Sequence, residues 1–397
     1  MTDVFGSIDK LADPAASYAL VAALSETSFR TARAFRLEET QRLLDVTNTD
    51  ALVLSIGADL PWLSGYEAMP LERLTALVIT RGNTPTLLVP ELEVARVRSD
   101  PDLFEVLPWK ESSDPYDMVV ELIRSATTVG VSDRMWTSAF LELQTRHPKA
   151  HYFSAARLLS QLRGVKDEVE LVMLARAAHI TDEVARELLD GKIPMIGRTE
   201  RDVSSDISTR LIDHGLNRVN FAIVGSGPNS ASPHHEPSSR LIRSGDPVVC
   251  DFGGVYTILE EPGYCSDITR TVVVGEIPDG FVELYEVLQS AQQASRCAIS
   301  GTITGHDLDL VARDEIARKG YGEYFIHRTG HGIGLEEHEE PYVVDINHKP
   351  LGAYAAFSIE PGIYLPGRFG ARIEDICVAG EHHGLSLNLA PRGLAVI

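Results

Sequence analysis

The sequence predicts an α/β (α+β) protein of two domains, a smaller one over residues 1–160 and a larger one over residues 161–397. Three observations carry this prediction. At 397 residues the chain exceeds the size at which a single hydrophobic core usually stops growing. Its N-terminal part alternates short β-prone runs with helical stretches, as small α/β domains do. Its C-terminal part is rich in β-prone runs, which a pair of helices interrupts at 280–320.

In the smaller domain, two β-prone runs at 74–79 and 86–89 flank the turn Arg81-Gly82-Asn83 and predict a β-hairpin. Helical stretches are expected at 38–44, 118–125 and 138–146, and further strands at 51–56 and 128–131. The residues before about 35 are rich in Ala and Ser, which predicts a helical lead-in or a partly ordered tail.

The larger domain begins with an amphipathic pattern over 165–190, which predicts a long surface helix and places the domain boundary at 155–165. A second helix is expected to start at Thr199, with this residue as N-cap and Asp202 as the acid at the third helical position. Strands are expected at 220–224, 247–252, 268–274, 357–359 and 372–378.

Composition excludes several classes of partner. The formal net charge of −21 argues against binding to nucleic acid or to an anionic membrane surface, because both need basic patches. The chain has no apolar run of about eighteen residues that could span a bilayer, and no secretory signal. The four cysteines form no CxxC pair, so we expect reduced thiols and a cytoplasmic location.

Two aspartates stand in strands where a carboxylate is costly. Asp251 lies inside the apolar run 248–252, and Asp267 opens a β-branched strand. Alternation puts Asp267 and Thr269 on one face of that strand, with Ile268 and Arg270 on the other. If the two strands pair as a hairpin, the two carboxylates lie side by side, about 5 Å apart. Like charges at that distance repel unless a cation sits between them.

Three further candidates lie nearer the C-terminus. Glycines flank His331 in Gly330-His331-Gly332, which permits special backbone angles and close approach. Glu360 ends an apolar strand at a Pro-Gly turn, and Glu374 is expected within the next strand. On that strand Arg372 and Glu374 share a face, while Asp375 points the other way.

Two Asp, two Glu and one His form an oxygen-rich ligand set. Closed structural zinc sites prefer Cys and His, so this set does not fit one. It suits two divalent ions of the manganese, cobalt, iron or zinc type, bridged by carboxylates and about 3.5–4 Å apart. Any one of these acids alone is more often a salt-bridged or capping residue, but the four acids and the histidine together, in such settings, favour a site.

The five segments that contain these residues resemble, in their order along the chain, the motifs of the pita-bread metallopeptidases. Within that family they resemble the Xaa-Pro dipeptidases (prolidases) and the aminopeptidases P. The segments are Asp251-Phe252-Gly253, Ser266-Asp267-Ile268-Thr269-Arg270-Thr271, Gly330-His331-Gly332-Ile333-Gly334, Glu360-Pro361-Gly362 and Arg372-Ile373-Glu374-Asp375. The resemblance covers the chain from about Lys166 to its end. It implies a C-terminal pita-bread (creatinase/aminopeptidase) domain preceded by a smaller creatinase-like α/β domain.

The resemblance also implies an activity and a ligand scheme. The activity is hydrolysis of the Xaa-Pro bond in dipeptides or short peptides by two divalent metal ions per chain, with manganese expected and cobalt or zinc as alternatives. Asp251 and Asp267 would bind one ion, Asp267 and Glu374 would bridge both, and His331 and Glu360 would complete the other. A small peptide substrate and a homodimer are the implied partners.

Further roles follow from the same resemblance. His234, His338 and Glu360 are the expected catalytic residues, with Glu360 or the bridging carboxylates taking the proton of the attacking water. His234, His327, His338 and Arg372 are expected to contact substrate, Arg372 through a carboxylate of the peptide. His235 is interpreted as structural.

Other readings of the chain remain open. An aminopeptidase P that takes longer Xaa-Pro peptides is the alternative activity, followed by a metal-free creatinase-like hydrolase and by a non-catalytic binding protein of the same fold. One departure from the family pattern is the fifteen residues between Asp251 and Asp267, where the family usually has a shorter hairpin. We expect a longer loop there, with an effect on substrate range.

Overall fold

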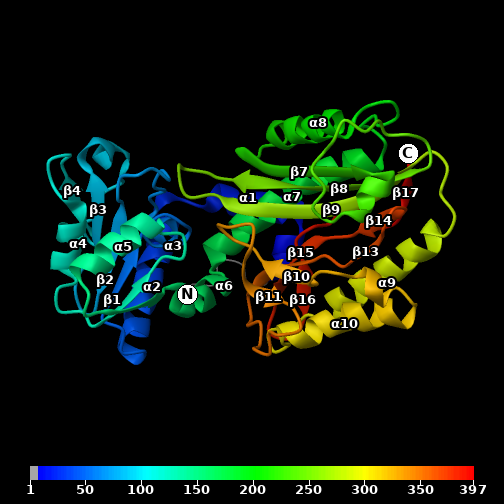
Figure 1. Ribbon diagram of the computed structural model, residues 1–397. Helices are drawn as coiled ribbons and strands as arrows, with labels where there is room; N and C mark the ends of the chain where they lie inside the picture. The colour runs from blue at the N-terminus through cyan, green and yellow to red at the C-terminus, as the bar shows by residue number, and fades with distance from the viewer. Residues whose placement is uncertain (1–7) are drawn as a thin grey trace. The chain divides into compact units, whose positions relative to one another are not determined.

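The computed structural model describes residues 8–397, which form two compact units (Figure 1). The larger unit contains the described residues up to Ala23 together with Gly164–Ile258 and Gly263–Ile397. The smaller unit contains Leu24–Arg163 and Leu259–Pro262. The N-terminal helices η1 (Ile8–Ala12) and α1 (Pro14–Ala23) therefore group with the larger unit, and not with the domain in which a division at residue 160 placed them.

The smaller unit is built on a six-stranded mixed sheet of order β4-β3-β2-β1-β5-β6 (Figure 1). Its hydrophobic core packs one face of the sheet against α4 and α5. The expected hairpin over the Arg81–Asn83 turn is confirmed as the antiparallel pair β2 and β3. The elements are α2 (Glu26–Val46), β1 (Ala51–Leu54), α3 (Asp59–Ser64), β2 (Ala76–Thr80), β3 (Thr86–Pro90), η2 (Glu91–Arg96), β4 (Glu105–Trp109), α4 (Pro115–Leu122), β5 (Thr128–Val131), α5 (Thr137–Arg146), β6 (His151–Ser154) and α6 (Ala156–Gly164).

The larger unit has a four-stranded sheet, β17-β9-β8-β7, on which the long helices α7 and α8 pack (Figure 1). The strands are β7 (Arg218–Ser226), β8 (Asp246–Tyr256), β9 (Tyr264–Val274) and β17 (Ala395–Val396), and the helices are α7 (Glu168–Leu189) and α8 (Glu200–Asp213). Aliphatic side chains of both helices bury the face of the sheet that carries Phe252 and Ile268. The opposite face of β8 and β9 carries Asp251, Asp267 and Thr269.

A second part of the larger unit joins the sheet β11-β10-β12-β15-β16 and the hairpin β13-β14 to two helices. The helices contribute a core of their own together with β13 and β14. The elements are η3 (Gly227–Ala231), α9 (Phe281–Ala298), α10 (Gly305–Arg318), η4 (Gly322–Tyr324), β10 (Gly330–Gly332), β11 (Glu339–Val343), β12 (Ala356–Ile359), β13 (Gly362–Leu365), β14 (Phe369–Arg372), β15 (Asp375–Ala379) and β16 (Gly384–Ser386).

The expected start of α8 is confirmed. Thr199 accepts a hydrogen bond from the backbone N–H of Asp202, and the Asp202 side chain accepts one from the backbone N–H of Thr199. This reciprocal capping box satisfies two N–H groups that a helix start otherwise leaves unpaired. Asp167 and Glu170 form the same device at the start of α7.

The hairpin β8–β9 corrects two expectations. Asp251 pairs with Thr269 and Gly253 with Asp267, so the two aspartates are diagonal neighbours on one face and not directly opposite. The strands continue to the pair Tyr256–Tyr264, so of the fifteen residues between the aspartates eight lie in strands and only seven, 257–263, connect them.

The half-buried Asp50, directly before β1, yields a stability prediction. The Asp50 carboxylate accepts hydrogen bonds from the backbone N–H groups of Thr127 at 2.8 Å and of Thr128 at 3.1 Å, and it pairs with Arg81. The Thr127 N–H first, together with the other donors and Arg81, holds the pKa of Asp50 well below its ordinary value. The carboxylate thus ties β1 to its parallel neighbour β5.

We expect Asp50→Asn to lower the free energy of unfolding of the smaller unit by about 1.5–3 kcal/mol at pH 7. Because the folded-state pKa is depressed, this stabilisation is present above the unfolded-state value of about 3.9 and is lost as the pH falls below it. The difference between variant and wild type should therefore shrink at pH 3. Urea unfolding followed by tryptophan fluorescence measures this unit, because all three tryptophans lie in it.

The exposed Asp45 on α2 supplies the matched control, since Asp45→Asn should change stability by no more than about 0.5 kcal/mol. An equal loss for Asp50→Asn at both pH values would contradict the assigned role of the charge.

Candidate metal centre

The two aspartates of the candidate centre project from the polar face of the β8–β9 hairpin. Their neighbours Phe252 and Ile268 fill the apolar core behind the sheet, so strand alternation forces the carboxylates to the other side. Asp251 and Asp267 are 7% and 4% exposed, which leaves them without water as a general partner. The predicted shared face of Asp267 and Thr269 is confirmed by their contacts, described below.

His331 lies in the short strand β10, where two glycines allow other strands to come very near. A Cβ at Gly330 would stand 1.9 Å from the carbonyl oxygen of Ser358, and one at Gly332 would stand 2.4 Å from that of Glu340. Neither glycine has a positive φ, so close approach and not a special backbone angle explains them. The His331 Nδ1–H donates to the Gly332 carbonyl oxygen at 3.1 Å, which turns Nε2 toward the acids.

The two glutamates follow strands directly. Glu360 comes immediately after β12, and its backbone N–H donates to the Thr329 carbonyl oxygen beside β10. Glu374 lies in the two-residue link between β14 and β15, not within a strand as expected. Its carboxylate accepts the hydroxyl of Thr269 at 2.7 Å, which ties the link to β9.

The structure brings four of the expected ligands to one place. Asp267, His331 and Glu374 each offer one ligand atom, and these atoms all lie within 4.8 Å of one another. The His331 Nε2 is 3.8 Å from Asp267 Oδ2, 4.0 Å from Glu374 Oε1 and 3.2 Å from Glu360 Oε1. Asp251 lies outside this group of three and is held at its margin by Arg372.

A test of fit to metal comes from the buried oxygens. Asp251 Oδ1, Asp267 Oδ1 and Glu374 Oε1 are buried and have no hydrogen-bond partner among the described residues. A buried carboxylate oxygen without a donor is strongly disfavoured, whereas such oxygens are the ligands that hard and borderline divalent cations take. The residues therefore fit a divalent metal site.

The pKa shifts of the clustered acids agree with this fit. Burial, and then the negative charges of Glu374, Asp251 and Glu360, raise the pKa of Asp267 well above its ordinary value. Burial and the charges of Glu360 and Asp251 likewise raise the pKa of Glu374. Burial acts in the same direction on Glu360, but the hydrogen bond and charge of His331 outweigh it and lower the pKa of Glu360. Only added positive charge would let all of these groups ionise together.

Arg372 turns its guanidinium to the protein's own groups. Its Nη2 lies 2.6 Å from Asp251 Oδ2, its Nε donates to the Thr269 hydroxyl and its Nη1 donates to Tyr364 Oη at 2.8 Å. Nη1 also reaches the Pro233 carbonyl oxygen at 3.2 Å. Four of the five N–H donors are thus engaged, and a forked grip on a peptide carboxylate would need two parallel ones.

His327 extends this chain of contacts. Its Nδ1 lies 2.7 Å from the Arg328 carbonyl oxygen, an acceptor only, so this nitrogen carries the proton. Its Nε2 then accepts the Tyr364 hydroxyl at 2.9 Å. Burial, and after it the positive charge of Arg372, lower the pKa of His327 against the opposing effect of the Glu360 charge. His327, which was expected to contact substrate, is therefore hydrogen-bonded to Tyr364. Tyr364 in turn accepts a hydrogen bond from Arg372, the ion-pair partner of the candidate ligand Asp251.

The other two expected histidines lie beside the centre. The rings of His338 and His331 have centroids 4.0 Å apart. Burial first, and then the charges of His331 and Arg328, lower the pKa of His338 to about 4. His234 is exposed, and it directly follows Pro233, the residue whose carbonyl oxygen meets Arg372.

A residue that the sequence did not single out holds the loop of His234. Glu200, fully buried at the start of α8, accepts hydrogen bonds from groups of the segment 226–238. Its donors are the backbone N–H and hydroxyl of Ser226, the Asn229 side chain, His235 Nε2, and the backbone N–H and hydroxyl of Ser238. These bonds outweigh the effect of burial, which alone would raise it, and lower the pKa of Glu200 to about 2.

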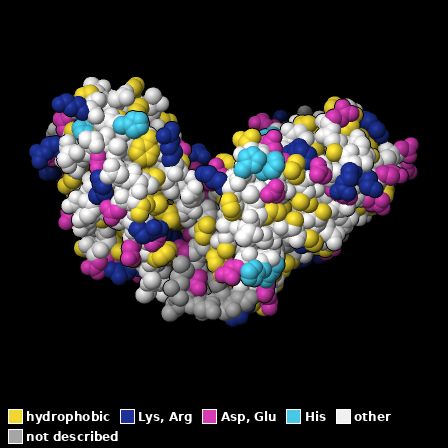
Figure 2. All heavy atoms as spheres, turned by 90° about the horizontal axis from the view of Figure 1, so that it is seen from below, with side chains coloured by type: hydrophobic (Ala, Val, Ile, Leu, Met, Phe, Trp, Pro, Cys, Tyr) yellow, Lys and Arg dark blue, Asp and Glu magenta, His cyan; other side chains and the backbone are white. Residues whose placement is uncertain are grey.

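Basic and acidic side chains of the described residues are mixed on the surface (Figure 2). On the face shown in Figure 2, described Lys and Arg side chains are interspersed with Asp and Glu. Among the described helices, none is long and apolar enough to cross a membrane.

Comparison with known proteins gives a consistent result. The model of metallopeptidase family M24 matches residues 173–381, and that of the creatinase/prolidase N-terminal domain matches residues 36–165. A probable dipeptidase PepE of Mycobacterium tuberculosis is 42% identical over 350 residues, which are 87% of this chain and 92% of that protein.

Solved structures agree. The dipeptidase PepE of Mycobacterium ulcerans has a TM-score of 0.86 and 41% identity, covering 92% of this chain and 98% of that one. An Xaa-Pro dipeptidase from Bacillus anthracis has a TM-score of 0.83 and 29% identity, covering 92% of this chain and 100% of that one. With a creatinase-type N-terminal domain and a catalytic domain that gathers buried acids around His331, the chain belongs to metallopeptidase family M24 and is an enzyme of the dipeptidase and prolidase type.

Proposed function

We propose that this metallopeptidase uses two divalent metal ions, manganese in the first place, to hydrolyse the Xaa-Pro bond of dipeptides. The single observation that carries the proposal is the set of three buried carboxylate oxygens, on Asp251, Asp267 and Glu374, that lack a donor among the described residues. Cobalt or zinc would satisfy the same ligand set, because oxygen and imidazole ligands accept all three metals.

In this proposal Asp251 and Asp267 would hold one ion, His331 and Glu360 would complete the second, and Asp267 and Glu374 would be shared by both. When bound, two such ions lower the pKa of water and polarise the scissile carbonyl. The Thr269 hydroxyl occupies Glu374 Oε2 and leaves Oε1 to the site, while Arg372 occupies one oxygen of Asp251 and leaves the other. The protein thus sets which oxygen of each acid is available.

Proton transfer and hydrogen bonding to the substrate are the parts of the reaction that Glu360, His338 and His234 would supply. Glu360 accepts the proton of the attacking water as general base. His338 and His234 donate hydrogen bonds to the oxygen and amide of the substrate as charge develops on them. A proline amide nitrogen carries no N–H, so the site need not supply an acceptor at that point.

Xaa-Pro preference is supported by the similarity to the Bacillus anthracis enzyme, and dipeptide length by the similarity to PepE. An aminopeptidase P that takes longer peptides is the second candidate, favoured by the engagement of Arg372 with Asp251. We further propose a homodimer and a cytoplasmic location, as the family resemblance implies.

The first prediction from the site concerns metal. Protein stripped with EDTA should not cleave Ala-Pro, and Mn²⁺ should restore activity with two ions bound per chain. Glu374→Gln should lower kcat/KM by more than about 100-fold, since even residues that only support a metal ligand cost about 10- to 100-fold. Equilibrium dialysis with elemental analysis, and rates on Ala-Pro, Ala-Pro-Ala and Ala-Ala, check metal content and specificity together.

Exposed Glu381 serves as control, and Glu381→Gln should behave as wild type. Full turnover in the stripped protein, or faster cleavage of Ala-Ala than of Ala-Pro, would overturn the corresponding half of the proposal.

The second prediction separates two roles for Arg372. If Arg372 orients Asp251, Arg372→Leu should reduce kcat/KM about 10- to 100-fold equally on Ala-Pro and on its C-terminal amide, because a buried charge pair is broken in either case. If instead Arg372 reads the substrate carboxylate, KM should rise on the free acid alone. Steady-state kinetics on the two substrates decide between these outcomes.

The third prediction concerns the loop of His234. Glu200→Gln removes the charge that gathers the donors of 226–238, and should reduce kcat/KM about tenfold while Mn²⁺ binding is unchanged. If this loss acts through His234, the double variant Glu200→Gln/His234→Ala should be no worse than His234→Ala by more than about twofold. Additive losses in this double-mutant cycle would show that Glu200 supports some other part of the enzyme.

A further inference from the structure

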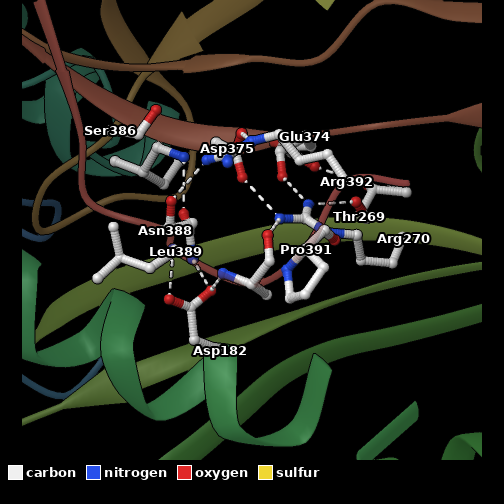
Figure 3. A network of polar contacts seen from close by, with 12 residues as sticks. Asp182, Thr269, Arg270, Glu374, Asp375, Ser386, Asn388, Leu389, Pro391 and Arg392 are labelled. Carbon is white, nitrogen blue, oxygen red and sulfur yellow. Dashed lines mark hydrogen bonds and ion pairs between the residues drawn. The ribbon is translucent and has the colours of Figure 1, made fainter. Parts of the chain in front are cut away.

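A second buried polar cluster, centred on Arg270 and Asp375, lies beside the backbone of Thr269 and Glu374 (Figure 3). Its centre is the ion pair of Arg270 and Asp375, at 2.8 Å, and both side chains are 0% exposed. Arg270 follows Thr269 on β9, and Asp375 follows Glu374. Neither residue faces the metal ligands, so the mechanism described above leaves the pair unused.

Arg270 is fully saturated by this arrangement. Each of its five N–H groups has an acceptor, and four of the acceptors are backbone carbonyl oxygens. The acceptors are Pro391 O for Nε, Thr269 O and Glu374 O for Nη1, and Ala390 O and Asp375 Oδ1 for Nη2. A lysine in this place has three donors on a point charge and could not span the same set.

The carbonyls that Arg270 binds belong to the residues that shape the site. Nη1 bridges Thr269 O at 2.9 Å and Glu374 O at 2.7 Å. The backbone N–H of Glu374 donates to the same Thr269 oxygen at 3.1 Å. One guanidinium nitrogen therefore fixes the separation between β9, which carries Asp267, and the link that carries Glu374.

Asp375 adds a third ligand-bearing segment to this junction. Its backbone pairs with Ile359 of β12, the residue before Glu360. Its carboxylate also accepts the Gln292 side chain at 2.6 Å and pairs with Arg392. The buried pair thus lies where the segments of Asp267, Glu360 and Glu374 meet.

Stability alone does not account for such a pair. Replacing a buried ion pair with apolar side chains is often neutral or stabilising, because burying two charges costs as much as their attraction returns. What apolar side chains cannot do is hold two carbonyl groups at a fixed spacing. Metal sites depend on spacing, since the residues behind the ligands set their orientation.

We propose that Arg270 and Asp375 are positioning residues that set the distance between Asp267 and Glu374, and so the affinity for the metal ion that these two share. The proposal rests on the proposed metal centre and assigns to it a part that lies outside the ligand set. It needs no contact of either residue with metal or substrate.

The same cluster contains a matched control. Asp182, on α7, is also 0% exposed, and it accepts the backbone N–H groups of Leu389 and Ala390 in the adjoining segment (Figure 3). Its hydrogen bonds and ion pair go to Asn388, Leu389, Ala390 and Arg186, and among the described residues it makes none with a candidate metal ligand. Asp182→Asn therefore perturbs the same buried region, including the segment of Ala390, but leaves the Thr269 and Glu374 carbonyls, which Arg270 Nη1 bridges, without a lost partner.

The experiment measures Mn²⁺ binding to the stripped full-length chain by equilibrium dialysis, alongside the melting temperature in EDTA. Arg270→Lys and Asp375→Asn should weaken Mn²⁺ binding about 10- to 100-fold. Asp182→Asn should lower the melting temperature as well, but leave Mn²⁺ affinity within about twofold of wild type. Arg392→Gln, which removes a less buried partner of Asp375, should weaken binding by a smaller factor and serves if the other variants do not fold.

Two results would overturn the proposal. One is wild-type Mn²⁺ affinity in every folded variant of Arg270, Asp375 and Arg392. The other is an equal loss of affinity in Asp182→Asn at a matched loss of melting temperature, which would mean that general loosening suffices. If the wild-type chain does not bind Mn²⁺ at all, the proposed function is rejected. That result differs from both outcomes above, in which the wild type binds Mn²⁺ and only the comparison among variants changes.

Discussion

The larger unit depends on one constraint, the repulsion among four carboxylates that the fold buries close together. Asp251, Asp267, Glu360 and Glu374 converge near His331, and three of these acids are at most 7% exposed. Repulsion among them is reduced by Arg372, by the Thr269 hydroxyl and by His331, but three oxygens remain without a donor among the described residues. The folded chain is therefore complete only with added positive charge, which explains why the fold and the metal chemistry belong together.

The β8–β9 hairpin solves this problem by alternation. Phe252 and Ile268 enter the apolar core under α7 and α8, and the aspartates next to them in sequence must then face the opposite way. Behind the link of Glu374, the same alternation sends Arg270 and Asp375 into a second polar layer. Neighbouring residues of one strand thus serve a catalytic face and a structural face at once.

Much of this could be predicted from the sequence, because the signals were local. The acids in β-branched runs, the glycines around His331 and the cap at Thr199 each report a conflict or a preference that one segment contains. The group of Asp267, His331 and Glu374 follows once those segments converge. The partners of Arg372 could not be predicted, since Asp251 and Tyr364 reach it from other strands. Glu200 was missed because an acid in the first turn of a helix is ordinary, and only the folded loop shows what it binds.

The long hairpin also bears on how such enzymes change over evolution. Strand pairing runs without a break from Asp246–Val274 to Tyr256–Tyr264, with the two aspartates partway along it. Residues inserted beyond them either enter the segment 257–263 or lengthen both strands by the same number, and neither event changes the register at Asp251. A single-residue insertion between Asp251 and the core pairs before it would instead exchange carboxylates for aliphatic side chains. Descendants of this chain can therefore gain or lose length at one end of the hairpin while the acids stay in place.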